Sequence, residues 1–406
     1  MNRQKKRKDA FLCLALAGLL CVAAPEAALA AETEGLTPEI SARLEDNRIE
    51  YDEWFDLLKY KYGPIRSAYE QIESSLESSG TITLETSLLA DDLMRQAQEL
   101  EDSMSGLPQE EKAALRAQAN GLKSQARSTR NTLFFSNQQM ESSRKSALRT
   151  MDRSTRSLVY QAESLMNQYE QLLSQRQIVA KSVELAQKAR DLQVQMEAQG
   201  MAVDADVLSA AAQLSSAQDQ LSTMDNGIAR LKGVLYSFAG VREGQNPEIG
   251  PVPGADPAAI ASIDLEGDLN KAVNNNSNAI SMRSGGSSQS VVEQQLVKST
   301  TVKKNKLRDT EYTENQVRSN VQTLYDDILE KKALYDSAST AWQSAQNTWN
   351  AAQVQRQTGM LSDIQYLQQE LAYLQAKSGM ECADLNLQQS MRSYEWAVKG
   401  VEVSAQ

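Results

Sequence analysis

Histidine is absent from this 406-residue sequence, and cysteine is nearly so. Without histidine there can be no Ser-His-Asp or Cys-His catalytic site, and the most common zinc and haem ligand is missing. Of Cys13, Cys21 and Cys382, only Cys382 lies outside an N-terminal apolar segment, so no intramolecular disulfide is expected. No glycine-rich phosphate loop or EF-hand spacing occurs. Chemistry by carboxylates alone stays open, but an enzyme is the least favoured class, and we expect no cofactor and no metal.

The first thirty residues have the pattern of a secretory signal peptide. The basic stretch MNRQKKRKDA precedes the apolar FLCLALAGLLCVAA, and ALA at 28–30 suits a cleavage site. This apolar run is shorter than the roughly twenty residues that a membrane-spanning helix needs. We expect removal of residues 1–30 and export to the cell envelope. The location would be the outer membrane or periplasm in a host with two membranes, and otherwise the extracytoplasmic face.

The rest of the chain is acidic. The full sequence has a net charge of −11, and residues 1–30 contribute five basic and two acidic residues, which leaves −14 for residues 31–406. An acidic surface repels phosphate backbones, so we expect no nucleic-acid partner.

Aromatic residues are few, while Gln, Ser, Ala and Leu are abundant, and this composition favours helix over sheet. Two stretches without proline or glycine run from about Asn131 to Gln199 and from about Ser287 to Thr358. Each predicts a helix about 100 Å long at about 1.5 Å per residue. The expected fold class is all-α, with long antiparallel coiled-coil hairpins in two tandem structural repeats. The expected segments are a signal peptide at 1–30, a first helical repeat at 31–240 with a helical insert at about 80–130, a Pro/Gly linker at 241–257, and a second helical repeat at 258–406.

Each repeat interrupts its long helix at one glycine and ends the returning helix at another. Gly200 and Gly240 are 40 residues apart, and Gly359 and Gly400 are 41 residues apart. Gly200 and Gly359 suit the left-handed backbone at a helix C-terminus, which predicts a chain reversal at each.

Side chains beside these glycines can cap the returning helices. Asp204 is the candidate in the first repeat, and Ser362 and Asp363 are the candidates in the second. The first returning helix also has an apolar seam with coiled-coil spacing. Before Gly359, a seam of small residues predicts close helix axes: Ala338, Ala341, Ala345, Thr348 and Ala352.

These glycine segments carry a resemblance to a known family. GMAVDADVL at 200–208, and more loosely GMLSDIQYL at 359–367, resemble the tip motif of the TolC family of outer-membrane efflux proteins. IDLEGDLNKAVNNNSNAISMRS at 263–284 resembles the helix that begins each unit of that family, with Ser277 where proline is usual, and ISARLEDNRIEYDEWFDLL at 40–58 is a weaker first copy. The resemblance covers most of the chain after residue 30.

The resemblance implies a TolC-like α-helical barrel protomer that acts as a passive channel subunit. Its partners would be two further copies in a homotrimer, a periplasmic-type adaptor (membrane fusion protein), and an ABC or RND-type exporter. The implied tip and adaptor-contact residues are Gly200, Met201, Gly359, Met360, Ser362 and Asp363. The implied entrance constriction involves Asp204, Asp206, Gln365 and Gln368, and only the first two of these are acidic.

The family also has membrane-spanning strands between the first helix and the long helix of each half. Such strands need about ten residues of alternating polarity. Only GTITLETSLL at 80–89 offers this, and VVEQQLVKSTTVKKNKLRDT at 291–310 does not. We therefore expect these strands to be missing or much reduced.

Two other interpretations stay open. A non-transporting helical scaffold or spacer of the cell envelope would use the same hairpins, and the missing strands and the two glutamines favour it. An exported hydrolase with a coiled-coil regulatory region is less favoured, because no catalytic domain follows the coils.

Overall fold

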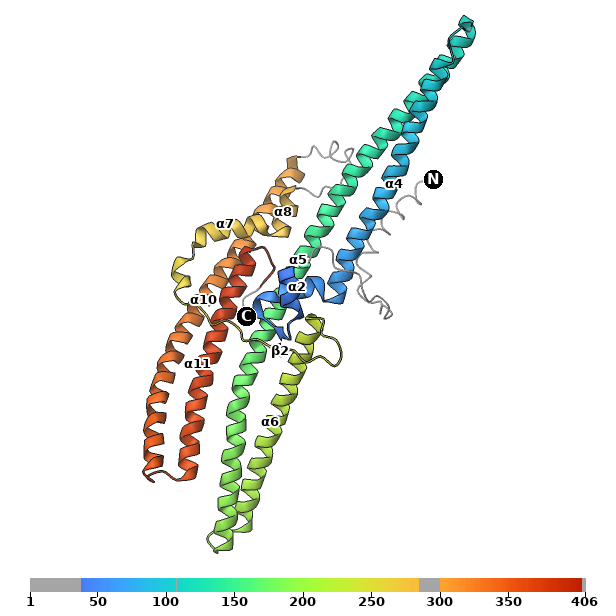
Figure 1. Ribbon diagram of the computed structural model, residues 1–406. Coiled ribbons are helices and arrows are strands. Elements are labelled where there is room, and N and C mark those ends of the chain that lie inside the picture. The colour runs from blue at the N-terminus through green and yellow to red at the C-terminus, as the bar shows by residue number, and fades with distance from the viewer. Residues whose placement is uncertain (1–37, 107, 285–299, 404–406) are drawn as a thin grey trace. The chain divides into compact units, whose positions relative to one another are not determined.

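The computed structural model describes residues 38–106, 108–284 and 300–403 (Figure 1). Residues 1–30, the expected signal peptide, and residue Ser287, the expected start of the second long helix, lie outside the described residues. Nearly all of the described chain is helical, which confirms the all-α fold class. The described chain forms two compact units, one of residues 38–45 and 58–155 and the other of residues 46–57 and 156–403.

The first unit is dominated by a helical hairpin. Helix α4 (Gly63–Asp102) is followed by α5 (Gln109–Ala198), whose residues up to 155 belong to this unit. Ala97, Met104 and Ala119 form a small buried cluster near the turn between the two helices. Lys123 forms an ion pair with Glu101 at 2.6 Å, so the helices run antiparallel away from that turn. The short α2 (Pro38–Glu45) and the end of α3 (Trp54–Tyr60) complete the unit.

One prediction for this region is wrong. Helix α5 begins at Gln109, not near Asn131, and it continues through Gly121. A single glycine costs a helix only about 1 kcal/mol, and packing of Ala119 and Ala126 in buried positions offsets that cost. Residues 80–89, the one segment with the alternation of a strand, are helical and belong to α4. This agrees with the expectation that strands are missing or much reduced. The segment pairs with α5 instead, where Thr83 donates to the Asn137 side chain at 3.0 Å.

The second unit contains two further hairpins. In the first, the C-terminal part of α5 pairs with α6 (Asp204–Phe238) through the ion pair of Arg176 and Asp225. In the second, α10 (Thr300–Gln357) packs along α11 (Asp363–Val398). The smaller elements are β1 (Arg48–Ile49), η1 (Tyr51–Glu53), β2 (Glu248–Ile249), η2 (Ala259–Ser262), α7 (Leu265–Asn275) and α8 (Ser277–Ser284), and β1 pairs with β2 in parallel.

Helices α5 and α11 join the two hairpins. Lys181 forms an ion pair with Glu370 at 3.1 Å, and the Asn167 amide donates to the Leu385 carbonyl at 2.6 Å. Residue numbers rise along α5 as they fall along α11, so the two helices are antiparallel. Since α5 ends at its tip and α11 begins at its tip, both tips lie at the same end of this unit (Figure 1).

A buried polar network lies between α5 and α11. Glu163 is 1% exposed and accepts a hydrogen bond from Trp396 Nε1 at 2.7 Å. Arg392 also forms an ion pair with Glu163. Next to this pair, Gln388 donates to the Tyr51 hydroxyl at 2.9 Å, and burial raises the pKa of Tyr51 far above its ordinary value. The Glu163 carboxylate accepts from both Trp396 and Arg392, so removal of Glu163 would leave these donors without that acceptor.

The predicted seam of small residues before Gly359 is wrong in part. Ala341 and Thr348 are exposed, whereas the ring of Trp349 lies between α10 and α11. Its centroid is 4.9 Å from that of Tyr366 and 5.8 Å from that of Tyr373. Ala338 and Ala345 are half-buried and Ala352 is buried, so the prediction holds at these three positions. Trp349 takes the place expected for Thr348, and its ring separates the two helices there.

Candidate functional site

The two tips share one backbone geometry. Gly200 and Gly359 have positive φ angles of 72° and 76°. At each tip the glycine N–H donates to the carbonyl three residues earlier, and the N–H of the following methionine donates to the carbonyl five residues earlier, at 2.8–3.1 Å. This pair of bonds is the Schellman motif, which ends a helix at a left-handed residue. A Cβ at either glycine would meet no atom within 4 Å, so the backbone conformation and not crowding favours glycine.

The second tip restarts its helix with a capping box. The Ser362 hydroxyl accepts from the Gln365 N–H at 3.3 Å, and the Gln365 side chain accepts from the Ser362 N–H at 3.1 Å. Ser362 is thus the N-cap, as the sequence predicts, and Asp363 is the first residue of α11. Gln365 is engaged in the cap, and the exposed Gln368 lies almost one turn further along α11.

The first tip restarts differently, and the prediction that Asp204 is its N-cap is wrong. Val203 occupies the cap position, and Asp204 is the first residue of α6. Valine has no side-chain acceptor, so the Asp206 carboxylate accepts the Val203 N–H at 3.2 Å instead. Asp206 therefore supports the turn from inside the helix.

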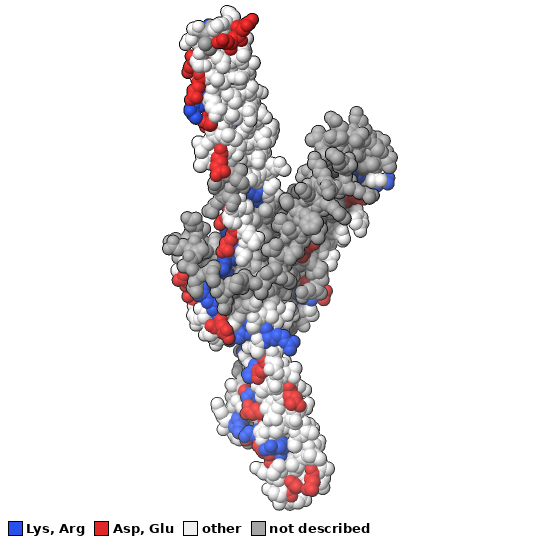
Figure 2. All heavy atoms as spheres, turned by 90° about the vertical axis from the view of Figure 1, so that its right-hand side faces the viewer, with Lys and Arg blue, Asp and Glu red and all other residues white. Residues whose placement is uncertain are grey.

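Charges at equivalent positions differ between the tips. Three residues before the glycine and four after it, the second tip has Arg356 and Asp363, which form an ion pair. Arg356 also donates to the Leu361 carbonyl at 3.1 Å. The first tip has Glu197 and Asp204 at these positions, and a hydrogen bond that protonated Glu197 donates to Asp204 raises the pKa of Glu197. Figure 2 shows Asp and Glu side chains gathered at the end of this hairpin.

Apolar side chains are also exposed at both tips. Met201 is 62% exposed and Met360 is 75% exposed, and Val203 and Leu208 of the first tip are similarly open. Methionine is flexible and polarizable, so it suits a surface that adapts to a partner. The sequence motifs contain these methionines, but they do not contain Glu197 and Arg356. The sequence feature that could have identified Glu197 and Arg356 is that each lies three residues before its tip glycine.

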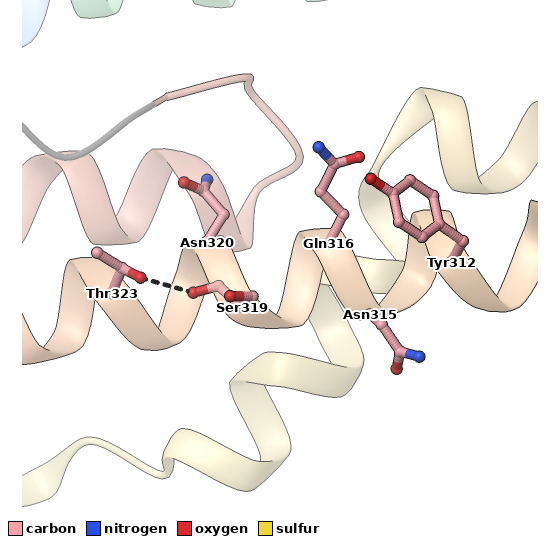
Figure 3. A pocket seen from close by; sticks show the side chains of 6 residues that line it. All are labelled: Tyr312, Asn315, Gln316, Ser319, Asn320 and Thr323. Carbon is pink, nitrogen blue, oxygen red and sulfur yellow. Dashed lines mark hydrogen bonds between the residues drawn. The ribbon is translucent and has the colours of Figure 1, made fainter.

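A polar groove lies on α10 in the second unit. It has a volume of about 460 Å³ and is lined by Tyr312, Asn315, Gln316, Ser319, Asn320 and Thr323 (Figure 3). Asn320 donates to the Val403 carbonyl at 2.6 Å, and Thr323 donates to the Ser319 carbonyl at 2.9 Å. The lining offers amides and hydroxyls but no charged group. Over the described ranges, no cluster of His, Cys, Asp and Glu has a geometry suited to a metal ion.

None of the described helices contains a segment with the length and apolarity of a membrane span. Cys382, half-buried on α11, is 4.0 Å from the Ser378 hydroxyl.

These features define a protein of tandem helical hairpins whose glycine tips lie at one end of a unit. The CmeC outer membrane channel of Campylobacter jejuni is similar over 95% of this chain and 95% of that chain, with a TM-score of 0.48 and 13% identity. The outer-membrane channel OprN is similar over 94% of this chain and 99% of that chain, with a TM-score of 0.43 and 12% identity. The outer membrane protein VceC of Vibrio cholerae is similar over 83% of this chain and 96% of that chain, with a TM-score of 0.39 and 14% identity. No protein-family model and no curated protein matches the sequence.

Proposed function

We propose that this chain is an exported, TolC-like component of an efflux or secretion duct, through which substrates pass without chemical change. One observation carries the proposal: two hairpins with the same Schellman glycine reversal lie side by side with both tips at one end of the unit. A duct built from copies of such a unit would have all of its tips at one entrance.

The assembly that we propose is a homotrimer. In the second unit, α5 and α11 contact each other, while α6 and α10 are the outer helices of the layer. Both outer helices expose apolar side chains that a neighbouring copy would cover. These residues are Leu208 and Val234 on α6 and Leu307, Leu329, Leu334 and Val354 on α10. The threefold number comes from the family resemblance.

The tips are the proposed contact for a membrane fusion protein, which would connect the duct to an ABC or RND-type exporter in the cell envelope. Met201 and Met360 supply exposed apolar surface for this contact. Asp204 and Asp206 supply acidic groups to the entrance from the first tip only. In the second tip Gln365 is held in its capping box, and Gln368 is uncharged. In each copy, only the first tip would therefore supply acidic residues to a ring at the entrance.

The test is the native mass of residues 31–406 together with electron microscopy of the particles. A trimeric ring or tube with an open centre and all tips at one end supports the duct. A chain that stays monomeric at concentrations of tens of micromolar contradicts it.

A helical scaffold or spacer of the envelope is the second candidate. The uncharged positions of the second tip favour it, since they do not build the constriction that the family resemblance implies. An assembly of the same mass with a closed centre would favour the scaffold. The scaffold would also be favoured if cells that lack the protein take up ethidium to the same extent as cells that contain it.

A further inference from the structure

Both long helices carry a basic segment at the same position relative to their tips. The two segments are SRKSALRTMDR at 143–153 of α5 and VKKNKLRDTEY at 302–312 of α10. Lys145 lies 55 residues before Gly200, and Lys304 lies 55 residues before Gly359. Each lysine is followed four residues later by an arginine. The two stretches, one in each unit, are called here the basic segments.

The basic segments differ in charge from the chain that contains them. Residues 143–153 contain four basic residues and one acidic residue, and residues 302–312 contain four basic and two acidic residues. Residues 31–406 as a whole have a net charge of −14. The charges of the two tips differ, whereas positive charge is present at the equivalent position of both halves. Each segment therefore attracts anions locally, although the chain as a whole repels them.

In the first basic segment, three cations form an exposed row. Lys145, Arg149 and Arg153 are four residues apart, so they share a face of α5, and all three are exposed. Lys145 pairs with Glu141 at 3.3 Å, while in the described part of the chain the two arginines form no ion pair. The antiparallel stretch 66–75 of α4 adds one arginine and two glutamates, and the arginine is already paired with one of the glutamates. The charge at this part of the hairpin stays positive.

The second basic segment lies in the first turns of α10. Lys304, Arg308 and Tyr312 take the three equivalent positions in the sequence. Arg308 is exposed and forms no ion pair within the described ranges, and Tyr312 is 70% exposed. Glu314, the first acid beyond the segment, is already paired with Arg283 of α8 at 2.7 Å. The tyrosine adds a ring with a polar end, which suits a boundary between an apolar and an aqueous layer.

The polar groove of the second unit begins about one helical turn beyond Arg308 (Figure 3). Asn315, Gln316 and Ser319 line it with amide and hydroxyl groups, which donate hydrogen bonds to phosphate oxygens. An arginine followed by uncharged donors is a suitable surface for a phosphate group.

A membrane surface fits the basic segments better than a nucleic acid does. Each row covers eight residues, or about 12 Å along its helix, and presents only a few cations. A nucleic acid carries its phosphates along a fixed line, which would continue over acidic surface beyond the row. Lipid headgroups move laterally and gather at a small patch. Acidic groups more than about 10 Å away are screened at 0.1 M salt, so they oppose such a local contact only weakly.

We propose that each basic segment is a contact site for anionic phospholipid headgroups at a membrane surface. The inference goes beyond the proposed duct, because each segment is considered within its own unit. It requires no assembly and no particular arrangement of the two units.

The test is co-sedimentation of residues 31–406 with vesicles of phosphatidylcholine that contain phosphatidylglycerol, compared with vesicles of phosphatidylcholine alone. Residues 1–30 are left out because their basic and apolar stretches would bind vesicles by themselves. We expect binding to the anionic vesicles that decreases as salt is raised. Arg149→Gln with Arg153→Gln should weaken this binding by about tenfold or more, and so should Lys304→Gln with Arg308→Gln. Each cation near an anionic surface contributes about fivefold.

Arg116→Gln with Arg127→Gln is the matched control. Both arginines are exposed on α5 outside the basic segment, and this double variant has the same net charge as the other two. It should bind the anionic vesicles within about twofold of the unmodified chain, because only cations close to the surface contribute. Helix content by circular dichroism checks that each variant folds. If a folded variant of either segment binds as the control does, the inference that both segments are contacts is overturned.

Two further measurements separate the remaining outcomes. A duplex DNA fragment is offered in place of the vesicles, and DNA binding as tight as vesicle binding, with the same losses in the two variants, overturns the inference in favour of a general polyanion site. The native mass separates the inference from the proposed function. A chain that binds anionic vesicles but stays monomeric supports the inference and contradicts the trimer. A trimer that does not bind anionic vesicles overturns the inference and leaves the duct standing.

Discussion

The two hairpin tips have the same backbone and different side-chain chemistry. Both reverse at a positive-φ glycine with the same two hydrogen bonds. The second tip is neutralised by Arg356 and Asp363 and capped by Ser362, whereas the first presents Glu197 and Asp204 and has Val203 at its cap position. A duplicated turn thus keeps the geometry that its backbone requires, while exposed positions are free to diverge. The first tip is the acidic and less firmly capped of the two.

The largest change in stability is expected from the buried polar network between α5 and α11, the helices that join the two hairpins with the tips. Glu163→Ala should lower the free energy of unfolding by about 3–5 kcal/mol, because it removes the buried carboxylate that accepts from both the half-buried Arg392 and Trp396 Nε1. Glu395→Ala is the matched control, since Glu395 pairs with the same arginine at 2.9 Å but is exposed. We expect less than about 1 kcal/mol for it. Urea unfolding of both variants measures the difference, and equal losses would contradict the role given to burial.

Substitution of the tip glycines tests whether the two backbones are equivalent. Gly200→Ala and Gly359→Ala should each destabilise their tip by roughly 1–2 kcal/mol, because a Cβ is unfavourable at a positive φ angle. The two losses should agree, since both glycines have similar φ angles and open surroundings. Hydrogen exchange of the tip amides measures the local opening. A loss at only one tip would show that the two reversals are not the same structure.

The cap positions give a matched exchange between the tips. Ser362→Ala should cost about 1 kcal/mol through loss of the N-cap acceptor, and Val203→Ser at the equivalent position of the first tip should stabilise by a similar or smaller amount. Protection of the first amides of α11 and α6 from hydrogen exchange is the measurement. If Val203→Ser leaves the protection of α6 unchanged, the Asp206 carboxylate already serves that end of the helix fully.

The smallest expected effect concerns charge at the first tip. The pKa of Glu197 is raised in the folded protein, so its contribution to stability is fully present below the unfolded pKa and is lost as the pH rises through the folded pKa. Glu197→Arg, which copies the second tip, should therefore protect the tip amides slightly better than the wild type at neutral pH. The advantage should shrink as the pH falls through the carboxyl range. Asp363→Asn at the other tip should show no such gain at neutral pH.

Sequence patterns located the helices and tips well where the signal was local. A glycine between two long helical stretches requires little more than the left-handed turn, so Gly200 and Gly359 could be placed from the sequence. Asp204 misled because an N-cap is defined by where the helix starts, and α6 starts one residue earlier than the sequence suggests. Trp349 was missed because it is adjacent to Thr348 on α10, and the spacing of small residues does not show which of the two side chains meets α11.

What the sequence determined by itself was the helical class, the duplication and the two reversals, because each follows from composition or from the conformational freedom of glycine. The tertiary structure decided which faces meet and which charges find partners. The continuation of α5 to Gln109 depends on a neighbour, α4, that the local sequence does not contain. The pairing of Glu163 with Arg392 joins residues 229 positions apart, and such long-range contacts depend on how whole helices pack.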